Sequence, residues 1–243
     1  MKIVGVIPAR YQSSRFPGKP LANICGRPMI WWVYHQAKKA KSLDELYVAT
    51  DDERICHVCE EYNINFVFTS NIHKTGADRV AEVAMKTDGD IYLNIQGDEP
   101  LIEEFAIEEI IKYKMSSDDK YVGMKSFIEN KSIADPNVVK VVTDLSGYAL
   151  YFSRSAIPYN IDNSCVYRCM GLYAYDRSLL LNFISWKQSK LELGEKGVEM
   201  LRAMEHGIKI RMYDTKWNSI GVDLPEHIQM IESIMKKRGI NCD

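Results

Sequence analysis

Residues 4–20 read VGVIPARYQSSRFPGKP, and this stretch decides how the rest of the chain is interpreted. The apolar run Ile3–Ile7 predicts a buried strand that ends at Pro8. Three cations within ten residues follow it and favour an anionic ligand, because guanidinium and ammonium groups match phosphate oxygens. A triphosphate is the natural candidate, and a solvated basic surface loop is the alternative. The polar side chains of this loop that we single out are Arg10, Ser14, Arg15 and Lys19.

Short apolar runs alternate with amphipathic segments over residues 1–115. This β-α order predicts an α/β fold, with a mostly parallel sheet and helices on both of its faces. The expected strands are Ile3–Ile7, Leu46–Thr50, Phe66–Phe68 and Asp90–Ile95. The expected helices are Met29–Lys39, Asp52–Tyr62, Ala77–Lys86 and Glu103–Met115.

The pattern changes near residue 120 and predicts a smaller, mixed, β-rich subdomain. Its expected strands are Tyr121–Phe127, Val138–Thr143, Ala149–Arg154, Gly171–Tyr175 and Ile208–Tyr213. Its expected helices are Leu179–Trp186, Val198–His206 and Pro225–Arg238. We expect residues 1–243 to form a single domain whose two halves, 1–119 and 120–243, share one sheet.

Composition excludes some classes of partner. The formal net charge of −2 gives no general attraction to nucleic acid or to an anionic membrane surface. No apolar run is long enough to span a membrane, and the first is too short for a signal peptide, so a cytoplasmic protein is expected. Cys56 and Cys59 form one C-x-x-C among six cysteines. Packing is favoured over zinc or redox chemistry because no second pair stands at zinc-site spacing.

Two aspartates are candidate metal ligands. Asp98 follows the strand Asp90–Ile95, where α/β proteins bind ligands, and a carboxylate facing a triphosphate suits Mg²⁺. The alternative is an ordinary acidic turn. Asp223 lies just before the helix expected from Pro225, and local sequence favours a helix N-cap there over a second metal ligand.

Seven blocks, in order over almost the whole chain, resemble the 3-deoxy-manno-octulosonate (Kdo) cytidylyltransferase family. They are residues 7–20, 48–51, 94–100, 138–142, 149–159, 171–175 and 221–225. The resemblance implies a Rossmann-like nucleotide-diphospho-sugar transferase fold. It also implies transfer of CMP from CTP to the anomeric hydroxyl of an acidic 3-deoxy sugar, with release of pyrophosphate, for bacterial lipopolysaccharide synthesis. Mg²⁺ as cofactor and a homodimer are further implications, with residues 1–119 binding CTP and residues 120–243 binding sugar and dimerising.

The resemblance assigns roles residue by residue. Catalytic roles fall on Arg10, Arg15, Lys19 and Asp98, and metal binding on Asp98 and Asp223. The nucleotide would be held by Arg10, Ser14, Arg15, Lys19, Thr75, Gly76 and Arg79, the last three from a block near the cytosine. The sugar would be contacted by Gln96, Arg154, Cys169, Tyr173, Glu199 and Met200, with Arg154 on its carboxylate.

The chain departs from the family pattern at two sugar-pocket positions. Cys169 stands where the family has histidine, and Met200 where it has glutamine. Each change removes hydrogen-bonding groups, and an unpaired partner costs about 1–3 kcal/mol. We therefore hypothesise a modified acceptor such as 8-amino-Kdo, with plain Kdo and compensating waters as the alternative. The rival functions are a sialic-acid type cytidylyltransferase and a catalytically silent nucleotide-binding module.

Overall fold

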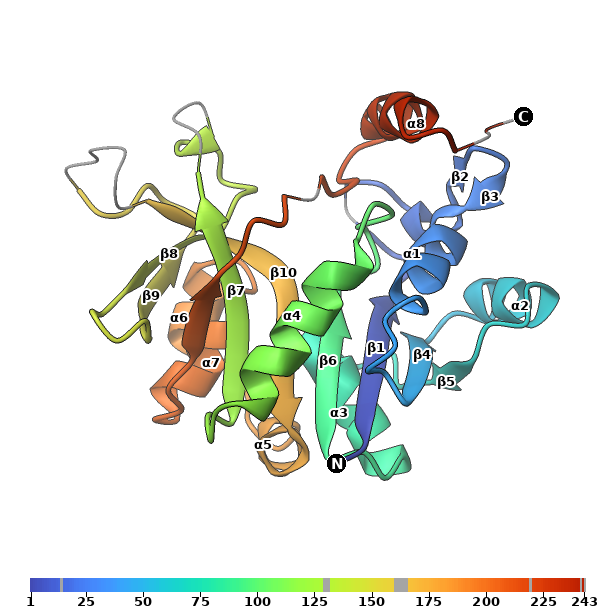
Figure 1. Cartoon of the computed structure of the whole chain (residues 1–243). Coiled ribbons are helices and arrows are strands. Elements are labelled where there is room, and N and C mark those ends of the chain that lie inside the picture. The colour runs from blue at the N-terminus through green and yellow to red at the C-terminus, as the bar shows by residue number, and fades with distance from the viewer. Residues whose placement is uncertain (14, 129–131, 160–165, 219, 241, 243) are drawn as a thin grey trace.

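The computed structural model describes residues 1–243 except 14, 129–131, 160–165, 219, 241 and 243. Its described strands form one sheet of nine, in the order β11-β7-β10-β6-β1-β4-β5, with β8 pairing β10 and β9 (Figure 1). A separate two-stranded ribbon joins β2 and β3. None of the helices in the described part of the chain is long and apolar enough to cross a bilayer.

The strands and helices have the following bounds. The strands are β1 Ile3–Ala9, β2 Asn23–Ile24, β3 Arg27–Pro28, β4 Glu45–Thr50, β5 Phe66–Phe68, β6 Ile91–Ile95, β7 Tyr121–Phe127, β8 Lys140–Thr143, β9 Ala149–Ser153, β10 Tyr167–Asp176 and β11 Arg211–Asp214. The α-helices are α1 Met29–Ala37, α2 Glu53–Glu61, α3 Gly76–Lys86, α4 Glu104–Met115, α5 Arg177–Phe183, α6 Lys190–Gly194, α7 Met200–Glu205 and α8 His227–Lys237. One 3₁₀ turn, η1, covers Lys19–Leu21.

The central strand β1 buries side chains on both faces, as expected for a parallel sheet covered by helices. Ile3 and Ile7 join a core cluster with residues of α1, α2 and α4, whereas Val4 and Val6 join a second cluster with residues of α3, α5 and α7. The period of two along the strand therefore assigns each helix to a face.

Strand pairing confirms the predicted α/β class with a mostly parallel, mixed sheet. β1 pairs in parallel with β4 and β6, and β4 pairs in parallel with β5. β10 runs antiparallel between β6 and β7, and so joins the two halves of the chain in one sheet. Because β1 and β6 are parallel neighbours, their carboxyl ends meet at one edge of this sheet (Figure 1).

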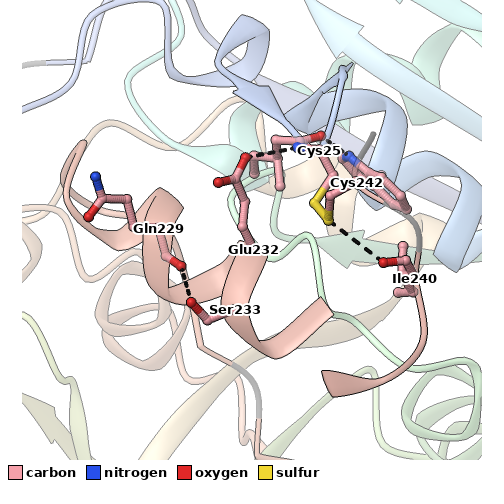
Figure 2. Close-up of a disulfide and its surroundings, with 8 residues drawn as sticks. Cys25, Gln229, Glu232, Ser233, Ile240 and Cys242 are labelled. Atoms are coloured by element: carbon pink, nitrogen blue, oxygen red, sulfur yellow. Dashed lines mark hydrogen bonds between the residues drawn. A yellow bond between two sulfur atoms is a disulfide. The ribbon is translucent and has the colours of Figure 1, made fainter. Parts of the chain in front are cut away.

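The C-terminal segment lies over the β2–β3 ribbon (Figure 1). Ile231 and Met235 of α8 are fully buried in a third cluster with Ile24. A disulfide joins Cys25 to Cys242, which the sequence analysis did not predict, and the Cys25 amide donates to Glu232 Oε1 at 3.0 Å (Figure 2). The tail is thus fixed to the ribbon by both packing and a covalent bond.

The C-x-x-C pair lies in α2 and has a packing role. Cys59 is fully buried in the first core cluster, and burial raises the pKa of its thiol to about 12. Cys56 is partly exposed on the same helix. A thiol held neutral in this way is a small apolar side chain at physiological pH.

Candidate active site

The carboxyl ends of β1 and β6 lie close enough together to require a glycine. A Cβ atom on Gly97 would lie 2.6 Å from the backbone oxygen of Pro8, nearer than real Cβ contacts come. The loop after β6 therefore passes directly against the end of β1. This close approach brings the acidic residues that follow β6 to the cationic loop that follows β1.

Lys19 is the centre of the resulting charge cluster. Its Nζ lies 2.6 Å from Asp98 Oδ2 and 3.8 Å from Asp223 Oδ1, and only 14% of its side chain is exposed. Arg15 Nη2 also donates to Asp223 Oδ1, at 2.8 Å. Two carboxylates that are far apart in the sequence thus meet around one ammonium group.

The local interpretation of Asp223 as a helix cap is wrong. Helix α8 begins at His227 with Glu226 as its N-cap residue, so Asp223 stands too far upstream to cap it. Its carboxylate pairs with Arg15 instead, and its backbone amide donates to His227 Nδ1 at 3.2 Å. The Asp223 carboxylate therefore belongs to the charge cluster around Lys19.

The other loop residues differ in how well they are held. Arg10 is exposed, and its Nη1 donates to the backbone oxygen of Lys74 at 3.3 Å, which links the loop to the segment before α3. Arg15 is 46% exposed on its side chain and also donates to Asn137 Oδ1. Ser14, predicted to bind phosphate, lies outside the described residues.

The predicted base-side block forms the start of α3. Thr75 is the N-cap residue and makes a capping box with Asp78, and a Cβ on Gly76 would lie 3.3 Å from Asn94 Nδ2 of β6. This brings Thr75 and Gly76 beside the ends of β6 and β1. Arg79 is different, because it is 1% exposed and pairs with Asp51 at 3.0 Å. The structure does not bring Arg79 to the cationic loop, and its guanidinium supports the turn after β4.

Three of the predicted sugar-side residues lie in one cluster. Cys169 packs against the second core cluster, which contains Tyr173 and Met200, and its Sγ lies 3.0 Å from Tyr173 Oη. Burial raises the pKa of the Cys169 thiol to about 12, so this position is a neutral thiol rather than a reactive thiolate. Cys169 and Tyr173 belong to β10. Gln96 lies beside this strand, since a Cβ atom on Gly171 of β10 would be 2.5 Å from Cγ of Gln96.

Glu199 stands at the N-cap of α7 and is 7% exposed. Its Oε2 accepts from the Ala77 amide at 3.0 Å and its Oε1 from Asn94 Nδ2 at 3.3 Å. Burial raises the pKa of this carboxyl to about 7. These contacts tie α7 to the start of α3, so Glu199 links the predicted sugar side to the predicted base side.

Sequence reasoning missed a buried ion-pair network beneath this link. Arg202 of α7 is 2% exposed and pairs with Asp78 of α3 at 2.7 Å and with Glu192 of α6 at 2.7 Å. The hydrogen bond from Arg202 and the charge of its guanidinium hold the pKa of Asp78 below its ordinary value against the effect of burial. No local pattern marks these charges as buried, since charged residues normally lie at the surface.

Arg154 follows β9 and is held by backbone groups on two sides. Its Nη1 donates to Pro136 O at 2.9 Å and its Nε to Glu195 O at 3.0 Å. The Glu195 carboxylate in turn accepts from the Arg154 amide at 2.7 Å. The guanidinium is therefore oriented before any acid binds to it. Glu195 and Pro136 were not among the predicted site residues.

The donor set of the charge cluster fits a magnesium ion bound together with phosphates. Mg²⁺ takes oxygen ligands and commonly only one or two protein carboxylates besides phosphate and water, and Asp98 and Asp223 present two such carboxylates around Lys19. Within the described ranges, no group of three or more His, Cys, Asp or Glu side chains is arranged to hold a metal by protein ligands alone.

Comparison with known proteins identifies the family of this chain. A family model described as cytidylyltransferase matches residues 4–210. The 3-deoxy-manno-octulosonate cytidylyltransferases of Geotalea uraniireducens (strain Rf4) and Geobacter metallireducens (strain ATCC 53774 / DSM 7210 / GS-15) are 44% and 45% identical, over 98% and 95% of this chain and 100% and 96% of theirs.

One solved structure points to the same family, and a second shares only the fold. A CMP:2-keto-3-deoxy-manno-octonic acid synthetase complexed with CTP superposes with a TM-score of 0.91 at 38% identity, covering 98% of this chain and 100% of the other. A putative glucose-1-phosphate thymidylyltransferase from Bacillus anthracis shares only the fold, with a TM-score of 0.71 at 15% identity over 96% of this chain and 94% of the other. The protein described here belongs to the 3-deoxy-manno-octulosonate cytidylyltransferase family.

Proposed function

We propose that the protein transfers CMP from CTP to the anomeric hydroxyl of Kdo or a modified Kdo and releases pyrophosphate. The observation that carries the proposal is the meeting of Lys19, Arg15, Asp98 and Asp223 at the ends of β1 and β6. The relatives named above are cytidylyltransferases of 3-deoxy-manno-octulosonate, which supports this acceptor over a sialic acid and an active enzyme over a silent module.

The chain's own groups would bind and polarise the triphosphate. The hydroxyl oxygen of the sugar forms a bond to the α-phosphorus, the bond from that phosphorus to the bridging oxygen of pyrophosphate breaks, and the hydroxyl proton leaves to solvent. Lys19, Arg10 and Arg15 would stabilise the charge that builds on the departing pyrophosphate. Arg15 pairs with Asp223 at 2.8 Å here, so a bound phosphate would compete for its guanidinium and release that carboxylate.

Asp98 and Asp223 would hold Mg²⁺ in this proposal. The ion, when bound, supplies neutralisation of phosphate charge and lowers the pKa of a coordinated hydroxyl. Arg154 would bind the sugar carboxylate, because two backbone carbonyls already fix its guanidinium.

The acceptor assay tests the proposal. Pyrophosphate release is measured with CTP and Mg²⁺ and, in turn, Kdo, 8-amino-Kdo and N-acetylneuraminic acid. We expect turnover with the Kdo compounds and none with the nine-carbon acid. Because Cys169 and Met200 replace the family's histidine and glutamine in the sugar pocket, we expect a gain in kcat/KM on 8-amino-Kdo, and equal or better use of plain Kdo would remove that refinement. No pyrophosphate with any acid would refute the function itself.

We also propose that the protein acts as a homodimer through its β-rich part. Its highly exposed large apolar side chains include Phe127, Leu145 and Leu150, at 62%, 109% and 60%. In the described sheet the strand partner of β9 is β8, so β9 is a terminal strand, and terminal strands are where a second copy can add to a sheet. Light scattering on the wild type and on Leu150→Asp tests this, with a monomeric wild type as the contrary result.

The cytoplasmic location stays a prediction.

A further inference from the structure

Lys140 is fully buried at the start of β8, and its ammonium is bound by backbone groups alone among the described residues. Its Nζ donates to Asp135 O at 2.9 Å, to Val138 O at 2.8 Å and to Arg154 O. An ammonium has three donors, so these bonds use all of them. In the part of the chain that the structure describes, no carboxylate oxygen lies within 4.0 Å of this Nζ.

A buried cation without a carboxylate partner is costly, and a methionine of similar length would pack there without this cost. Burial accordingly lowers the pKa of Lys140. Lys140 therefore contributes to the structure through its three hydrogen bonds. They tie the turn at residues 135–138 to the backbone at Arg154, on the other side of the β8–β9 pair.

The turn held by Lys140 contacts both arginines that the proposed reaction uses. Pro136 O accepts from Arg154 Nη1 at 2.9 Å, and Asn137 Oδ1 accepts from Arg15 Nη1. Pro136 thus orients the group proposed to bind the sugar carboxylate. Asn137 contacts a group proposed to bind the triphosphate.

We propose that Lys140 is a positioning residue for both substrates: it fixes the turn at 135–138, and through that turn the guanidinium groups of Arg154 and Arg15. Lys140 touches neither substrate itself. The inference rests on the proposed function for the roles of the two arginines, but the fixing of the turn can be measured without it. Arg154 depends on Lys140 more strongly than Arg15 does, because Lys140 also bonds the carbonyl of Arg154 itself.

The test compares Lys140→Met with Lys114→Met in steady-state kinetics with CTP, Mg²⁺ and Kdo. Lys114 is a matched control, since it is also a buried lysine (4% exposed) but pairs with Asp176, the last residue of β10, at the end of the sheet away from the site. For Lys140→Met we expect the KM for Kdo to rise by about 10- to 100-fold, the size of effect that small misplacements produce, with a smaller rise in the KM for CTP. For Lys114→Met we expect a lower melting temperature with both KM values unchanged.

Hydrogen exchange gives a readout that does not depend on catalysis. Amides of residues 135–140 should exchange faster in Lys140→Met than in the wild type, while those of β1 and β6 keep their protection. If the wild type releases no pyrophosphate, the proposed function fails, and the exchange data together with calorimetric CTP affinity still decide the role of Lys140.

Two results would overturn the inference. One is a folded Lys140→Met protein with unchanged exchange at residues 135–140 and an unchanged KM for Kdo. The other is failure of both Lys140→Met and Lys140→Gln to fold under conditions in which Lys114→Met folds, since Lys140 would then serve stability alone. Lys140→Gln keeps two donor hydrogens on a side chain one bond shorter, and should show an intermediate KM for Kdo.

Discussion

Replacing Lys19 with methionine removes the ammonium 2.6 Å from Asp98 Oδ2 and 3.8 Å from Asp223 Oδ1, and keeps an unbranched stem. The side chain is only 14% exposed, so its charge is partly shielded from solvent. At an effective dielectric constant of about 20, the ammonium and a phosphate charge about 4 Å away interact by about 4 kcal/mol. We expect the more exposed Arg10 and Arg15 to replace at most half of this interaction when Lys19 is removed. A loss of about 2–4 kcal/mol lowers kcat by about 30- to 900-fold.

The assay is continuous pyrophosphate release at saturating CTP, Mg²⁺ and Kdo. Lys237→Met, on the exposed side of α8, is the control and should keep the wild-type kcat. Melting temperatures establish that both variants are folded. A folded Lys19→Met protein with a kcat within about threefold of the wild type would refute the role given to this ammonium.

Three further predictions concern the scaffold. Burial raises the pKa of Glu199 from 4.5 to about 7, so the folded state holds this proton more tightly than the unfolded state does. The free energy of unfolding should therefore fall as the pH rises from 4.5 to 7, by at most about 1.4 kcal/mol per pH unit. Glu199→Gln should flatten this decline in urea titrations at pH 5 and pH 7, and an equal decline in the two proteins would count against the prediction. Cys242→Ser should lower the unfolding free energy by about 2–4 kcal/mol without reductant and by little with it, and thiol counting in denaturant checks the bond to Cys25 directly. Gly97→Ala should cost about 1–3 kcal/mol, because its Cβ would meet Pro8 O, whereas Gly194→Ala, with open space around it, should not.

The sequence allowed most of the long elements to be predicted, because their apolar spacing reflects burial directly. The segment Ala77–Lys86 differs from the observed α3 by one residue, and Tyr121–Phe127 matches β7. Short elements were missed, such as the two-residue strands of the β2–β3 ribbon and the single-turn helix α6, since so few residues carry no periodicity. β10 extends back to Tyr167, four residues before the predicted start, because β7 and β8 supply partners that only the tertiary structure reveals.

Charged residues on loops were picked out from the sequence, whereas the contacts that buried charges make were not. Arg15, Lys19 and Asp98 were identified from the sequence, and the fold brings them together with Asp223, whereas Arg10 bonds the backbone of Lys74. The ion pair of Arg202 with Asp78 joins segments distant in sequence, and the backbone bonds of Lys140 bury an ammonium group within residues 135–154. Hydropathy assigns such residues to the surface, so their contacts emerge only from the fold.

The metal site is tested most directly by a titration of Mn²⁺, in place of Mg²⁺, followed by water-proton relaxation, with and without CTP. It compares the wild type with Asp98→Asn and Asp223→Asn. We expect CTP to strengthen Mn²⁺ binding to the wild type and each substitution to weaken the ternary complex by about tenfold or more. If both variants bind Mn²⁺ and CTP as tightly as the wild type does, the two carboxylates do not share an ion on the nucleotide, and the proposed site is wrong.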